Sequence, residues 1–103
     1  MIRHTILFKT KAGLSEQVIE AACADFLSLK KKLPGIVTMV GGRCALHEGK
    51  GSNVFSHAFS IDFLDKKAMN LFLTDPVTHP AKDGIVNIAE GGYAGLMGFD
   101  LEY

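Results

Sequence analysis

Residues 54–63 read VFSHAFSIDF, and their strict alternation decides the fold. Such a period of two is typical of a β-strand that buries one face. One face carries Phe55, His57, Phe59, Ile61 and Phe63. The other carries Val54, Ser56, Ala58, Ser60 and Asp62. We therefore expect a strand here whose Phe-rich face packs against the core.

Three further stretches, residues 2–10, 36–40 and 94–103, are rich in β-branched, aromatic or alternating apolar residues and predict strands. In the first of them, one face carries His4, Ile6 and Phe8. In the last, one face carries Met97, Phe99, Leu101 and Tyr103. We expect the Phe-rich faces of the first, third and fourth strands to lie beneath the helices.

Helical spacing of apolar residues separates these strands. A helix begins after the N-cap Ser15 and ends before Pro34, and a second begins after Asp65 and runs to about residue 73. A further helical stretch covers about residues 80–90. Between residues 41 and 53, the density of glycines predicts a hairpin loop that exposes His47.

The resulting order β-α-β-β-α-β predicts a ferredoxin-like α+β fold, as one domain over residues 1–103. It has a four-stranded antiparallel sheet with the helices on one face. We expect the first and third strands to be parallel neighbours. The opposite sheet face mixes small and apolar residues, and its exposure would leave a sizeable patch, so we expect a symmetric homodimer.

Composition excludes several classes of protein. The 103 residues contain 11 Lys and Arg against 11 Asp and Glu, so no basic footprint points to nucleic acid or to a membrane surface. The apolar stretches are also too short to span a bilayer. Cys23 and Cys44 are too few for a disulfide framework, and we expect free thiols and a cytoplasmic setting.

Three histidines carry the candidate chemistry. His4 and His57 are predicted on the helix-facing side at the same height in adjacent strands, and His79 lies in a loop over that face. A Phe-lined space with three imidazoles suits a small hydrophobic or aromatic molecule and acid/base catalysis at neutral pH. No close His-x-His spacing predicts a metal site. The catalytic candidates are His79 and His57, and the candidate ligand contacts are His4, Phe8, Phe59 and Phe72.

Five segments, HTILFK (4–9), LPGI (33–36), SHAF (56–59), DPVTH (75–79) and GFDLE (98–102), occur in the order found in one family. Together they make the chain resemble the stress-responsive dimeric α/β-barrel (Dabb) family over nearly its whole length. The resemblance implies a dimeric ferredoxin-like barrel.

One relative within this resemblance is a plant polyketide cyclase that forms olivetolic acid. By that likeness, His79 would be catalytic, with His4 and His57 in the pocket. Phe72 stands where the cyclase has a catalytic tyrosine, and Asp75 replaces the first histidine of the family's His-Pro-x-His, with one residue inserted.

These observations leave three functional hypotheses. The first is a dimeric small-molecule-binding protein or cofactor-independent enzyme that acts on a polyketide-like or aromatic molecule. The second is a non-catalytic structural stress protein whose histidines satisfy core hydrogen bonds. The third is a degradative isomerase or monooxygenase that needs neither metal nor flavin. An open cavity lined by His4, His57 and Phe72 would favour the first over the second.

Overall fold

The computed structural model describes residues 1–45 and 55–103. In these two ranges, four strands and three α-helices follow one another, joined by short 3-10 helices. In chain order they are β1 (Ile2–Phe8), α1 (Glu16–Leu27), η1 (Ser28–Lys31), β2 (Ile36–Arg43), β3 (His57–Phe63), α2 (Lys66–Thr74), η3 (Pro76–Thr78), α3 (His79–Ile88), η4 (Gly92–Gly95) and β4 (Met97–Glu102). The predicted hairpin loop with His47 falls largely on residues outside the described ranges.

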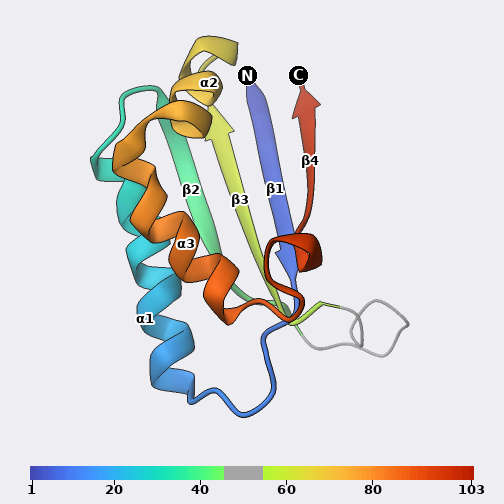
Figure 1. Ribbon diagram of the computed structural model, residues 1–103. Coiled ribbons are helices and arrows are strands. Elements are labelled where there is room, and N and C mark those ends of the chain that lie inside the picture. The colour runs from blue at the N-terminus through green and yellow to red at the C-terminus, as the bar shows by residue number, and fades with distance from the viewer. Residues whose placement is uncertain (46–54) are drawn as a thin grey trace.

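The four strands form one sheet in the order β2-β3-β1-β4, and each neighbouring pair is antiparallel. Helices α1 and α3 lie side by side on one face of this sheet (Figure 1). The two chain ends meet at one edge, where the Met1 ammonium donates to the Tyr103 carbonyl at 3.0 Å. This arrangement confirms the predicted ferredoxin-like α+β fold.

Local signals in the sequence set the helix boundaries. Ser15 Oγ accepts the Val18 N–H at 3.2 Å at the start of α1, and Asp65 Oδ1 accepts the Ala68 N–H at 2.9 Å at the start of α2. Before β2, Gly35 has a φ of +85°, and a Cβ there would lie 2.4 Å from the Ala68 Cβ. Glycine therefore allows both the turn and the close approach of α2.

The core lies between the sheet and the helices and is built largely from phenylalanine. Its rings contact one another, with Phe26 and Phe59 centroids 4.6 Å apart and Phe63 and Phe72 centroids 5.3 Å apart. Each of five rings is 1% exposed or less: Phe8, Phe26, Phe59, Phe63 and Phe72. The Phe-rich face of residues 57–63 thus packs where the alternation predicts.

The expectation that the first and third strands run parallel is wrong. They are antiparallel, with His4 opposite Ile61 and His57 opposite Phe8. At about 3.3 Å per residue, these two pairs lie roughly 13 Å apart along the strands. In a split β-α-β unit the third strand returns between the first and second and must oppose both, so His4 and His57 sit at opposite ends of the sheet.

The predicted orientation of the last strand is also wrong. Asp100 is paired with His4 and Gly98 with Ile6, and paired residues share a face. These residues therefore point toward the helices, whereas Met97, Phe99 and Leu101 lie on the opposite face and are 53–55% exposed. Alternation separates the two faces of a strand, but the register with its neighbour decides which face is buried.

Candidate functional site

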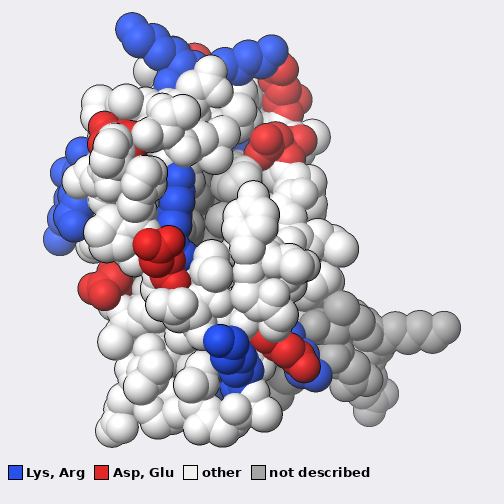
Figure 2. All heavy atoms as spheres, in the orientation of Figure 1, with Lys and Arg blue, Asp and Glu red and all other residues white. Residues whose placement is uncertain are grey.

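A cavity of about 400 Å³ lies between α3 and the strands β1 and β4. The surface is hollowed here, and a basic side chain runs along the edge of the hollow (Figure 2). Its walls are mostly apolar, with contributions from Ile6, Phe72, Leu73, Ile85 and Leu96. The volume and the apolar lining suit a small organic molecule.

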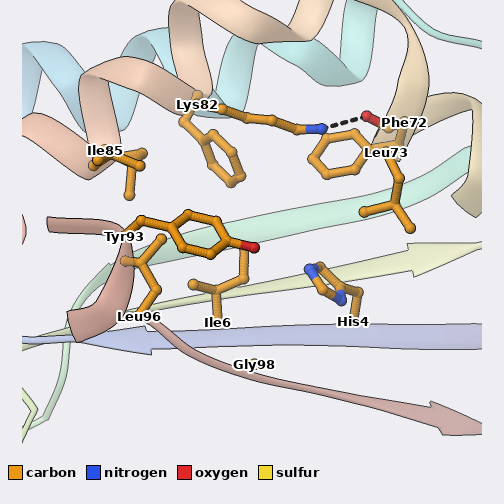
Figure 3. A pocket seen from close by; sticks show the side chains of 11 residues that line it. His4, Ile6, Phe72, Leu73, Lys82, Ile85, Tyr93, Leu96 and Gly98 are labelled. Carbon is orange, nitrogen blue, oxygen red and sulfur yellow. Dashed lines mark hydrogen bonds between the residues drawn. The ribbon is translucent and has the colours of Figure 1, made fainter.

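His4 brings an imidazole to the strand side of this cavity (Figure 3). Its Nδ1 and Asp100 Oδ1 are hydrogen-bonded, and the side chain of His4 is 17% exposed. A carboxylate only accepts, so we assign the neutral imidazole as the tautomer with the proton on Nδ1. Nε2 then keeps its basic lone pair for a ligand, and Asp100 fixes the ring orientation.

Lys82 places a cation on the helix side. Its Nζ donates to the Phe72 carbonyl at 2.5 Å and lies 4.5 Å from the centroid of the Phe72 ring. Burial lowers the pKa of Lys82. Within the described ranges, Lys82 forms no ion pair with a carboxylate. The lysine is therefore a partly desolvated charge without a counter-ion.

Tyr93 supplies an aromatic wall from η4. Its ring extends across the cavity with the hydroxyl directed toward the His4 side (Figure 3). The residue is 81% exposed, so one side of the ring faces solvent. Tyr93 is therefore the solvent-exposed wall of the cavity.

Of the six predicted site residues, the structure brings His4 and Phe72 together at this cavity. Their ring centroids lie 6.4 Å apart. Phe8 and Phe59 are stacked within the core at 6.1 Å and are not among the lining residues. They support the fold rather than the cavity wall.

His57 lies at the other end of the sheet, so the prediction that it shares a cavity with His4 is wrong. It is 6% exposed, stacks on Phe8 at a centroid distance of 5.6 Å, and its Nδ1 lies 2.9 Å from Ser56 Oγ. Desolvation, with a smaller contribution from Arg43, lowers the pKa of His57. Its surroundings are those of a buried, neutral imidazole.

His79 is the first residue of α3 and is exposed. Its backbone N–H donates to the Pro76 carbonyl, which continues the turn of η3 into the helix. The side chain is not among those that line the cavity. The structure therefore does not gather the three imidazoles in one space.

Besides several apolar wall residues, sequence reasoning missed Lys82, Tyr93, Gly98 and Asp100 at the site. Lys82 precedes Ile85 by three residues, and this helical spacing could have indicated a shared face. Asp100 alternates with Phe99 in the last strand, but its position beside His4 depends on the β1–β4 register. No local sequence pattern predicts that register.

The two thiols and the acidic groups do not build a metal site in the described residues. In those ranges, no group of three or more His, Cys, Asp or Glu side chains is arranged to hold a metal ion. Cys23 and Cys44 are free thiols, and burial raises the pKa of the Cys23 thiol. Among the helices described, none is long and apolar enough to cross a membrane.

The antiparallel β2-β3-β1-β4 sheet with its helices on one face defines the ferredoxin-like class of α+β proteins. Within that class, residues 2–101 match the stress responsive A/B barrel domain, Dabb, and the chain belongs to this family. No curated protein matches the chain.

Solved structures share this fold. A dimeric ferredoxin-like protein of unknown function from Jannaschia sp. CCS1 is 24% identical, with a TM-score of 0.86 over 99% of this chain and 98% of that one. Hydroxynitrile lyase from Passiflora edulis is 18% identical, with a TM-score of 0.79 over 97% and 90%. The cofactor-independent oxygenase SnoaB from Streptomyces nogalater is 14% identical, with a TM-score of 0.74 over 99% and 91%.

Proposed function

We propose that the chain binds a small aromatic or similarly apolar molecule in the cavity and transfers a proton on it without a cofactor, with His4 as the acid/base. The observation that carries this proposal is the His4–Asp100 pair at the wall of an apolar cavity of about 400 Å³. We assign the role to His4 rather than to His79 or His57, because neither of those imidazoles lines the cavity.

The pair supports proton transfer for a physical reason. Asp100 accepts the Nδ1 proton of His4, so Nε2 is the atom that exchanges a proton with a ligand. When Nε2 takes a proton, the imidazolium that forms is stabilised by the adjacent carboxylate.

Two structural neighbours support this class of chemistry. One is described as a hydroxynitrile lyase and the other as a cofactor-independent oxygenase. At these identities the likeness shows the fold alone, and one fold hosts many activities. The neighbours thus show that this fold can hold enzymes, one of them cofactor-independent, while the reaction and the residues are argued from this chain.

A non-catalytic structural role is the second candidate. The surroundings of His57, which is buried against Phe8 and hydrogen-bonded with Ser56, favour it for that residue. His4 differs because it lines the apolar cavity of about 400 Å³ and is paired with a carboxylate, whereas His57 lies at two smaller pockets of about 150 and 200 Å³ and bonds with a hydroxyl. The two candidates therefore make opposite predictions for variants of His4.

Deuterium exchange at the methyl group of acetophenone, followed by NMR in D₂O, tests the proposal without knowledge of the natural substrate. We expect the protein to accelerate exchange, and His4→Gln to lower the rate by about 100-fold. Asp100→Asn lowers it as well, because an amide oxygen still accepts the Nδ1 proton but lacks the negative charge that stabilises the imidazolium. His79→Gln, at an exposed position, is the matched control and keeps the wild-type rate. Unaccelerated exchange, or equal rates for all variants, would contradict the proposal.

We further propose that the chain forms a homodimer in the cytoplasm through the sheet face that carries no helices. This apolar face is defined by Leu7, Val40, Met97, Phe99 and Leu101. Val40 is 62% exposed, and Met97, Phe99 and Leu101 are each more than half exposed. The burial of such a patch favours association. The Jannaschia protein of the same fold is described as dimeric, which supports the proposal.

A further inference from the structure

The positive charge of the Lys82 ammonium group is the charge at the cavity that neighbouring groups neutralise least. An ammonium group has three N–H donors, and the described contacts of Lys82 use one of them, in the bond to the Phe72 carbonyl. The face of the Phe72 ring offers a weak attraction at 4.5 Å. Two donors thus remain for a ligand, in surroundings that weaken hydration of the charge.

The remaining acid of the site does not compensate for Lys82. Asp100 bonds with His4 and is not among the lining residues, and its side chain is 46% exposed. Among the residues that line the cavity, Lys82 is the single lysine, arginine, aspartate or glutamate, and its charge is positive. A ligand with one negative charge would complete the pairing.

We propose that Lys82 makes the cavity selective for monoanionic aromatic ligands, with carboxylates as the fitting class. The inference rests on the proposed function and adds the charge of the ligand to it. The carboxylate oxygens accept the free N–H donors of Lys82, while the ring of the ligand lies among the apolar walls and beside Tyr93 (Figure 3). A phosphate dianion fits less well, because one ammonium among apolar walls leaves most of its oxygens without donors.

Three isosteric probes separate charge from shape. Benzoate, benzamide and benzamidine have nearly the same size and carry a charge of −1, 0 and +1. We expect calorimetric titration of the wild-type protein to give the order benzoate, benzamide, benzamidine, with benzoate bound about tenfold more tightly than benzamide. Shape-driven binding alone would give equal affinities for the first two.

Substitutions assign the preference to Lys82. Lys82→Met keeps the apolar stem and removes the charge, and we expect benzoate affinity to fall about tenfold while benzamide affinity stays unchanged. Lys82→Arg keeps the charge and the preference. Lys31→Met removes an exposed lysine in η1 and serves as the matched control. A benzoate preference that survives in Lys82→Met would overturn the inference.

Lys82 also donates to a carbonyl in the last turn of α2, where a positive charge is favourable. Thermal melting of both Lys82 variants detects this structural contribution. A lower melting temperature in Lys82→Met, with the benzoate preference retained, would reduce Lys82 to a helix cap and overturn the proposal. Equal binding of benzoate and benzamide to the wild type would overturn the charge selectivity alone. A wild type that binds no probe would contradict both this inference and the proposed function.

Discussion

The guanidinium of Arg3 holds the carboxylate of Asp62 across β1 and β3 by two hydrogen bonds, from Nε at 2.8 Å and from Nη2 at 3.1 Å. Thr38 Oγ1 donates a third at 2.8 Å. The bonds from Arg3 are the main reason why the pKa of Asp62 falls from 3.8 to about 2. The folded protein thus favours the ionised form of this carboxyl group.

This pair predicts a specific acid sensitivity. Because the folded pKa of Asp62 lies below its unfolded value, the stabilisation is complete above about pH 4 and is lost as the pH falls toward 2. We expect Asp62→Asn to lower the free energy of unfolding at pH 7 by about 1–2 kcal/mol. Urea denaturation should show this difference shrinking between pH 4 and pH 2.5. Asp25→Asn, at an exposed position on α1, is the control, and a difference independent of pH would contradict the assignment.

The exposed ring of Phe99 allows a test of the oligomeric state. It is 55% exposed on the apolar face of the sheet, and a charge there would oppose association. We expect light scattering at micromolar concentration to give twice the 11.1 kDa mass of the chain, and Phe99→Asp to give a monomer. Val18→Asp, at a half-exposed position on α1, should stay dimeric. A monomeric wild type would remove the dimer proposal.

Truncation to alanine should destabilise the protein much more at His57 than at His79. His57→Ala removes a buried ring that stacks on Phe8 and the hydrogen bond between that ring and Ser56, whose hydroxyl keeps only its contacts with Thr10, so we expect a cost of about 3 kcal/mol in unfolding free energy. His79→Ala, at an exposed position, should cost less than about 0.5 kcal/mol. Equilibrium denaturation of both variants at pH 7.5 measures this. Equal costs would show that His57 is not a satisfied core residue.

Much of the fold could be predicted because its signals are local. The alternation around Phe59, the caps Ser15 and Asp65, and the Pro34-Gly35 stop each act within a few residues, and the structure places strands and helices accordingly. A period of two or of 3.6 residues is a property of a single element. These signals determined element type and order without knowledge of their neighbours.

The candidate site could be predicted only in part, because it depends on relations between elements. The direction of β3 beside β1 separates His57 from His4, and the β1–β4 register places Asp100 at His4. Lys82 reaches Phe72 through the packing of α3 against the end of α2. The antiparallel pairing of β1 and β3 follows from the ferredoxin-like topology and could have been predicted from the sequence. The strand register and the helix packing could not.

Gly98 offers a way to close the cavity from its strand side. It lies beside His4, and a Cβ there would be 3.5 Å from the Thr5 carbonyl oxygen and 3.9 Å from His4 Cε1, both ordinary contacts. We therefore expect Gly98→Val to fold, with an unfolding free energy within about 0.5 kcal/mol of the wild type, because valine suits a strand. Its isopropyl group occupies space that a ligand needs, and benzoate affinity should fall about tenfold. Gly84→Ala on α3, where an added Cβ meets only the Ala22 Cβ at 4.0 Å, should keep wild-type affinity. Calorimetric titration of both variants decides the matter, and wild-type binding by Gly98→Val would place the ligand outside this cavity.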